Sequence, residues 1–329
     1  MTDSITTYIT EYYPSRMRGR ITAFIFGIGA GLGSGFGATV VYRAVGIAWG
    51  WQWLFYILGG GAVIVYVLYL LLLPESARWL QVRGRWEEAE KILARIESQI
   101  DPSLEERYRR DLSAYAARVL SVTEGKERVG IRDILGPEYR RRTAILWQYN
   151  FFMMGTAWPL NMWVPSIIMP AYGTDLGSMI MMIIYLGNFF GSMIAVAVCE
   201  RLGRKNMLVI GLSFAGMMMI VFGHVLDLPT HAALAGMLYQ VGIGLQVSQG
   251  YAYAQELFPT RARASAFASG TGMGRIGMSI FPVIFGMLMS SVGPSWVLTI
   301  SGILVLISIS IVAVFGVSTK GKTLEELSR

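Results

Sequence analysis

Charge is scarce in this chain, because Asp, Glu, Lys and Arg make up only 15% of its 329 residues, whereas soluble proteins carry about 25%. The single cysteine, Cys199, excludes an internal disulfide framework. The two histidines, His224 and His231, have no cysteine or carboxylate cluster beside them, so we expect surface residues and no metal or other cofactor. The same scarcity argues against an enzyme, since no acid, base or nucleophile cluster converges within the apolar segments.

Long hydrophobic runs dominate what is present. Hydrophobic residues make up 54% of the sequence, and the mean hydropathy is +0.50. The segments 53–73, 207–226 and 297–315 each have the length of about 18 or more apolar residues that crosses a bilayer. The chain is therefore expected to be an all-α protein of the lipid bilayer with many membrane passes.

Eight complete membrane helices and one stub are predicted. The helices are expected at 20–43, 52–73, 143–168, 176–198, 206–226, 232–256, 264–290 and 295–316. The stub, residues 1–13, is too short to span a bilayer at about 1.5 Å per residue, so the chain is expected to begin within a helix.

Basic residues gather at one side of these helices. Of the 28 Lys and Arg residues, only Arg43 and Arg275 fall elsewhere. The positive-inside tendency predicts that this side is cytoplasmic, including the C-terminus. The net charge of +7 is thus interpreted as membrane topology and not as a nucleic-acid surface.

Four parts are predicted along the chain. Residues 1–73 form the remainder of an N-terminal membrane half, and 74–142 form a charged, amphipathic helical linker. Residues 143–316 form a six-helix membrane half, and 317–329 form a cytoplasmic tail. A linker of this kind is either a solvated face or a brace between the two membrane halves.

An internal repeat relates the two membrane parts. "EYYPSRMRG" at 11–19 matches "ELFPTRARA" at 256–264, with the shared frame Glu-x-x-Pro-x-x-x-Arg-small. Two halves with corresponding helices are typical of secondary transporters, whose substrate site lies between the halves near the midplane.

With this repeat, three further motifs resemble the major facilitator superfamily of secondary transporters. They are "PESARWL" with "GRWEEA" at 74–89, "ERLGRK" at 200–205 and "KGKTLEE" at 320–326. The resemblance covers the whole chain and implies helices 4 to 12 of a twelve-helix fold. It implies transport by alternating access. The stretch "TAWPLNMWVPSIIMPAYG" is more similar to organic-acid and nicotinate-type proton symporters than to sugar porters, which usually have paired glutamines where Gln148-Tyr149-Asn150 stands here.

One face of the predicted helix 232–256 carries polar residues. They are Tyr239, Gln246, Gln249, Tyr253 and Glu256, with helical spacing. Polar groups are costly in hydrocarbon, so this face either lines a substrate cavity or forms hydrogen bonds between helices. Further candidates for substrate binding are Trp158 and Asn161 beside the kink-forming prolines Pro159 and Pro165, and Asn188 on the next helix.

Arg275 lies near the middle of the predicted helix 264–290, and no Asp or Glu lies deep in the predicted helices. A charge within the membrane suggests function, and a guanidinium recognises carboxylate or phosphate through its planar fork. Arg275 is therefore predicted to attract an anionic substrate, and the alternative is a structural arginine.

Asp3 in the stub is a candidate for proton coupling, because desolvation raises the pKa of a carboxyl group.

Two further groups of residues have expected roles. A cytoplasmic gate is predicted from the family's charged clusters, at Glu11, Arg18, Glu75, Arg78, Glu200, Arg201, Arg204, Glu256 and Arg263. Close helix packing is predicted at Gly27, Gly31 and Gly35, with Gly187 and Gly191 as the facing small residues.

The sequence favours a proton-coupled carrier of a small organic acid or sugar-like metabolite in the plasma membrane, with unknown oligomeric state. A sugar facilitator remains open. So does a non-transporting remnant or regulatory membrane subunit, since the resemblance leaves the first three helices unmatched.

Overall fold

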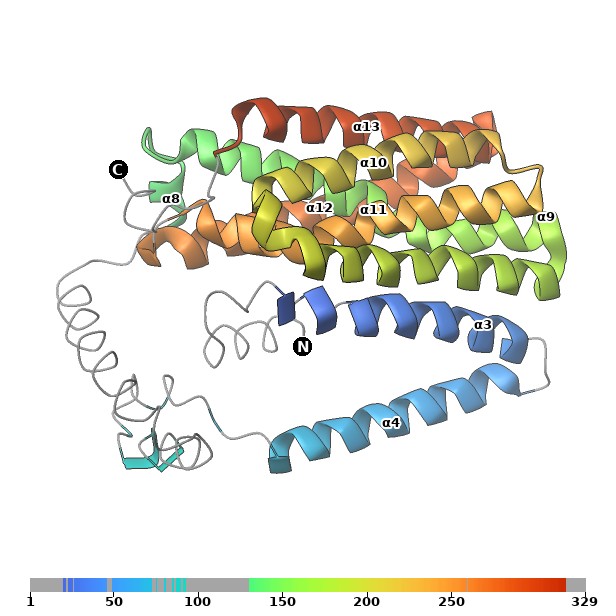
Figure 1. The fold of residues 1–329 in the computed structure, drawn as a ribbon, viewed down its shortest axis with the longest axis horizontal. Coiled ribbons are helices and arrows are strands. Elements are labelled where there is room, and N and C mark those ends of the chain that lie inside the picture. The colour runs from blue at the N-terminus through green and yellow to red at the C-terminus, as the bar shows by residue number, and fades with distance from the viewer. Residues whose placement is uncertain are drawn as a thin grey trace. The chain divides into compact units, whose positions relative to one another are not determined.

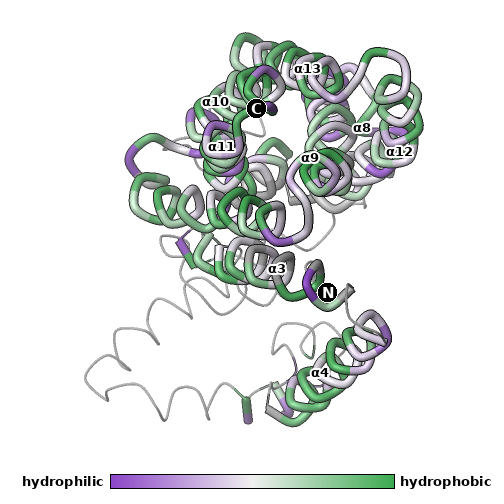
Figure 2. The backbone as a smooth tube through the Cα atoms, turned by 90° about the vertical axis from the view of Figure 1, so that its right-hand side faces the viewer, coloured by the Kyte–Doolittle hydropathy of each residue, from purple (hydrophilic) through white to green (hydrophobic). Residues whose placement is uncertain are grey.

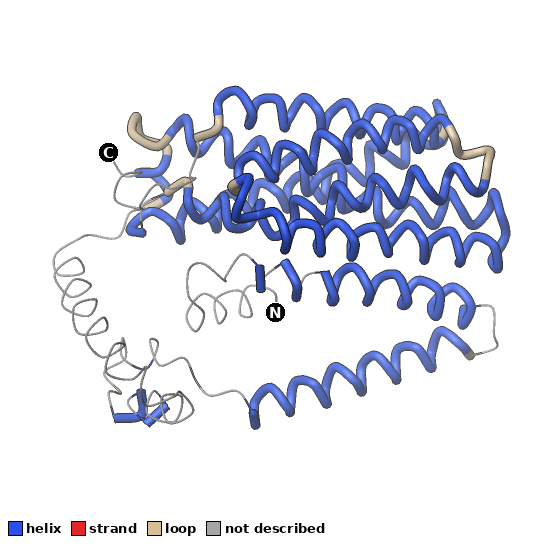
Figure 3. Tube along the Cα trace, in the orientation of Figure 1, coloured by secondary structure: helices blue, strands red, loops and turns tan. Residues whose placement is uncertain are grey.

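A computed structural model describes most of the apolar sequence. The described residues are 20–21, 23–25, 27–45, 49–72, 75, 80, 85, 87–89, 91–92, 130–258 and 260–317. Every regular element among them is a helix (Figure 3). This confirms the all-α fold class.

The helices follow the hydropathy pattern closely (Figure 1). They are the π-helical turn η1 (Gly27–Leu32), α3 (Gly33–Val45), α4 (Gly50–Leu72), α8 (Ile131–Ile134), α9 (Arg140–Leu202), α10 (Arg204–His224), α11 (Pro229–Glu256), α12 (Thr260–Val292) and α13 (Pro294–Phe315). Each predicted span from 52 onward is found within a few residues of its expected ends.

The long element α9 comprises two predicted membrane helices. They meet at Gly173, whose φ of 73° and ψ of 174° interrupt the helical geometry. This backbone conformation is open almost only to glycine, because a Cβ would clash with the backbone. The turn expected between the predicted spans 143–168 and 176–198 is thus reduced to one residue. The turns at Gly203 and Gly293 likewise have positive φ.

Five of the described helices are long and apolar enough to cross a membrane. They are Gly50–Leu71, Arg140–Cys199, Arg204–His224, Ser265–Val292 and Pro294–Phe315. The helix α11 is long enough but less apolar, because glutamines such as Gln240, Gln246 and Gln249 interrupt its hydrophobic sequence. Such glutamines indicate that α11 is shielded from lipid by other helices.

The chain divides into two compact units. The larger contains 14–50 and 129–329, and the smaller contains 1–13 and 51–128. In the smaller unit, α4 is exposed along its length and coloured hydrophobic over much of it (Figure 2). Its aromatic residues at the start, Trp51, Trp53 and Tyr56, suit a membrane interface.

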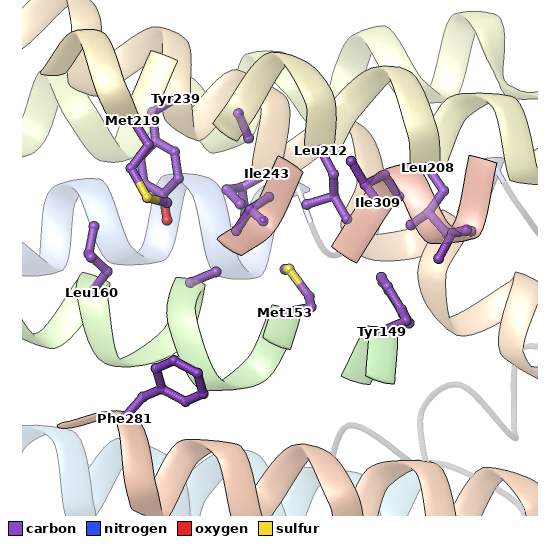
Figure 4. Packing of buried hydrophobic residues seen from close by; sticks show 14 of the residues in the cluster. Tyr149, Met153, Leu160, Leu208, Leu212, Met219, Tyr239, Ile243, Phe281 and Ile309 are labelled. Carbon is purple, nitrogen blue, oxygen red and sulfur yellow. The ribbon is translucent and has the colours of Figure 1, made fainter. Parts of the chain in front are cut away.

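The larger unit holds the main hydrophobic core, where α11 packs between α10 and α9. Figure 4 shows buried residues of α9, α10 and α11 meeting, among them Met153, Leu212 and Ile243. The backbones of α9 and α11 approach closely at glycines. A Cβ added at Gly187 or Gly191 would meet the carbonyl oxygen of Met237 or Val241.

The glycine-rich segment packs on the second half of α9. A Cβ at Gly27 would lie 2.8 Å from the Cβ of Ser192, and one at Gly31 would meet the backbone of Phe189. Gly187 and Gly191 thus face α11 and not the glycine-rich segment, so the expected glycine-to-glycine contact is replaced by glycine against Phe189 and Ser192. The surroundings of Gly35 are outside what the structure describes, so its role in helix packing stays a prediction.

Candidate functional site

A row of polar contacts runs between the first half of α9 and α11. Near the middle, the hydroxyl of Tyr149 donates to Oε1 of Gln246 over 3.1 Å, and Nε2 of Gln246 lies 3.8 Å from the sulfur of Met153. Gln246 is only 2% exposed. Its buried amide is therefore satisfied by the facing helix, as buried polar groups require.

Asn161 is the centre of a second group of contacts, about two turns beyond Met153 along α9. Nε2 of Gln240 donates to its Oδ1 over 2.6 Å, and the hydroxyl of Tyr185 donates to its backbone oxygen over 3.0 Å. In a regular helix this oxygen would accept from residue 165, but Pro165 has no N–H. Tyr185 therefore takes the place of the missing helical hydrogen bond, and the three residues connect both halves of α9 with α11.

The other predicted residues on these helices divide into two groups. Gln249, Tyr253 and Asn188 are buried. Trp158 is 51% exposed and does not share their environment. The contacts recorded for Gln246 and Asn161 are hydrogen bonds between helices, and a substrate role for these residues stays a prediction.

Arg275 lies apart from the polar row. Its side chain is exposed on α12 beside the exposed apolar residues Ile276 and Met278. Gly274 and Gly277, which flank it, approach Asn150 and Phe151 of α9. Arg275 and Gln246 are thus at similar levels along α9, but the structure does not bring their side chains together. Both were predicted to bind substrate only because they are polar residues in apolar helices.

Basic residues at the start of two helices bind the end of two others. Nη1 of Arg142 donates to the backbone oxygen of Leu257, which follows α11, over 3.2 Å. Nζ of Lys205 donates to the oxygens of Ala313 over 2.9 Å and Gly316 over 2.8 Å, at the end of α13. Cations at helix C-termini satisfy unpaired carbonyl groups and oppose the helix dipole favourably.

Replacement of Lys205 by methionine should loosen the end of α13. The variant keeps the aliphatic stem but loses two charge-assisted hydrogen bonds, so we expect local opening to become easier by about 1–2 kcal/mol. Hydrogen exchange in a peptide covering 306–317 should then be about tenfold faster. Lys91→Met, at an exposed position of the smaller unit, is the control. Equal exchange in both variants would contradict the role assigned to Lys205.

The predicted gate is only partly visible. Glu75 and Arg201 are exposed, and Arg204 is half-buried. Asp3, Glu11, Arg18 and Arg78 lie outside the described residues, as do the side chains of Glu200, Glu256 and Arg263. In the same basic region Arg85 forms a 2.6 Å ion pair with Glu88, and its hydrogen bond lowers the pKa of the Glu88 carboxyl. The gate and the proton-coupling residue therefore stay predictions.

Lys205 and Gln240 are site residues that sequence reasoning missed. Lys205 was visible only as part of the "ERLGRK" motif, and its partner is 108 residues away. Gln240 lies next to the polar face of α11 and was passed over because it breaks the strict spacing. Its hydrogen bond to Asn161 depends on how α9 is bent.

The chain is similar to known membrane transporters over nearly its whole length. It is 26% identical to the niacin transporter of Acinetobacter baylyi over 98% of this chain and 70% of that protein. It is 24% identical to the 4-hydroxybenzoate transporter of the same organism over 94% and 66%. A third relative, a putative metabolite transport protein of Bacillus subtilis, is matched over only 60% of its length.

The fold is shared with a solved transporter. The major facilitator superfamily proton:xylose symporter XylE superposes with a TM-score of 0.73 at 22% identity, covering 98% of this chain and 69% of that one. Residues 2–329 match the family described as sugar (and other) transporter. The chain therefore belongs to this family of membrane transporters and has part of the major facilitator superfamily fold.

Proposed function

We propose that this protein takes part in proton-coupled transport of a small organic acid by alternating access. The observation that carries the proposal is Arg275, a cation in the middle of the apolar helix α12. Neither α12 nor the segment 140–172 of α9 contains an Asp or Glu to neutralise it. A guanidinium at membrane depth with no acidic residue on these described segments is costly, so it is expected to serve an anionic ligand.

The relatives support the same class of substrate. Niacin and 4-hydroxybenzoate, which appear in the names of two of them, are both aromatic carboxylic acids. The Tyr149–Gln246 and Asn161–Gln240 pairs, which lie apart from Arg275, offer neutral hydrogen-bonding groups to such a molecule. Asp3 is proposed to carry the coupled proton. The gate residues are proposed to close the protein on its basic side. This side is proposed to face the cytoplasm, with the protein in the plasma membrane.

Uptake into proteoliposomes tests this proposal. We expect the full chain to accumulate radiolabelled nicotinate or 4-hydroxybenzoate, faster with an imposed proton gradient, and not to accumulate xylose. Uptake of xylose alone, unaffected by protons, would favour the sugar facilitator. No uptake of any solute, with helical content intact, would favour a non-transporting membrane subunit.

A further inference from the structure

Tyr239 has a buried hydroxyl group that no described contact satisfies, and the same holds for the hydroxyl of Tyr253 and Oε1 of Gln52. Tyr239 is 0% exposed, and its hydroxyl has no hydrogen-bond partner among the described residues. Figure 4 shows the ring extending from α11 toward the part of α9 that carries Leu160. Buried hydroxyl groups are nearly always hydrogen-bonded, so an unsatisfied one calls for a bound group that completes it.

Its surroundings form a cluster of hydrogen-bonding groups. Gln240 follows Tyr239 on α11 and binds Asn161, and Tyr185 binds the backbone of the same asparagine. All these groups are uncharged in the membrane, so the cluster suits a neutral hydrogen-bond acceptor and not an ion.

The same part of α9 lacks two helical hydrogen bonds and can therefore bend more easily. Pro159 and Pro165 remove the hydrogen bonds that would otherwise join this helical turn to the turns before and after it. Bending of α9 at this turn, as a ligand enters between α9 and α11, therefore breaks side-chain contacts around Asn161 but few helical hydrogen bonds.

We infer that Tyr239, with the Asn161–Gln240 pair beside it, is a subsite that binds the second polar group of an aromatic carboxylate. The hydroxyl of Tyr239 donates to a ring nitrogen or a phenol oxygen on the ligand. This inference rests on the proposed function, in which Arg275 attracts anionic solutes, but Arg275 lies apart from Tyr239, so the two residues do not hold one small acid at the same time. The two sites make separable contributions, because one recognises charge and the other recognises a neutral acceptor.

Comparison of three acids separates the two contributions. Benzoate has only the carboxylate, whereas nicotinate and 4-hydroxybenzoate add a ring nitrogen or a hydroxyl group. Equilibrium binding of each acid to the full chain in nanodiscs should show about tenfold tighter binding of nicotinate or 4-hydroxybenzoate than of benzoate. Tyr239→Phe should abolish that preference and leave benzoate affinity within twofold.

The control is Tyr172→Phe, because the Tyr172 hydroxyl already donates to the backbone oxygen of Leu226. It should retain the preference. If Tyr239→Phe retains the preference, or the wild-type chain shows none, the inference is wrong while the proposed function stands. A loss of thermal stability in Tyr239→Phe with an unchanged preference would indicate a buried water and would also overturn it. If none of the three acids binds, the proposed function fails and the inference with it.

Discussion

Replacement of Arg275 by glutamine should weaken the binding of carboxylate substrates by about 100-fold. Glutamine keeps a polar side chain of similar reach but loses the charge, and hydrogen bonds to charged groups contribute about 1.5–3 kcal/mol. All carboxylates should be affected alike, since the charge and not the remainder of the ligand is recognised. Competition against labelled nicotinate uptake in proteoliposomes measures the change.

Two further variants make this test specific. Arg275→Lys should retain part of the affinity, because lysine keeps the charge but not the planar fork. Arg43→Gln removes an exposed arginine at the end of α3 and should have no effect. Unchanged affinity in both Arg275 variants would mean that the arginine is structural, and the anionic substrate class would then lose its main support.

Replacement of Gly191 by leucine should prevent stable packing of the larger unit. At this position the second half of α9 lies against the carbonyl group of Val241 in α11, so a side chain would have to displace backbone. Overpacking in a core costs about 1–3 kcal/mol, and more where backbone has to move. We expect a large fall in the yield of monodisperse protein and in its melting temperature in detergent.

Gly60→Leu is the matched control for this substitution. Gly60 lies in α4, where a Cβ would have no atom within 4 Å. Leucine is the better helix former by about 0.5–1 kcal/mol, so this variant should be as stable as the wild type or more so. If Gly191→Leu melts within a few degrees of Gly60→Leu, the close approach of α9 and α11 does not limit stability.

Local sequence properties predicted the helices well, because membrane spans are determined by hydrophobicity along the chain. The ends of α10 and α13 were predicted within a few residues. The π-helical turn Gly27–Leu32 was not predicted, because such a change of winding responds to packing on Phe189 and Ser192 and not to local propensity.

The candidate site was less predictable, since its contacts join residues far apart in sequence. The polar face of α11 was identified from spacing, but the partner of Gln246 is 97 residues away and that of Gln240 is 79 residues away. Glycine spacing suggested close packing at Gly187 and Gly191, yet spacing alone does not tell which neighbour approaches. Arg275 was identified by its charge. The side of α12 from which its side chain projects could not be predicted, because it depends on the tertiary structure.

The single-residue turn at Gly173 has a consequence for how the protein enters its membrane. No linker separates the two halves of α9. The chain therefore starts its return across the membrane directly after the first half ends. We therefore expect the two halves to enter the lipid together, as a helical hairpin. The weakly hydrophobic α11, which follows α9 in the chain, is then expected to meet a partner that is already in place.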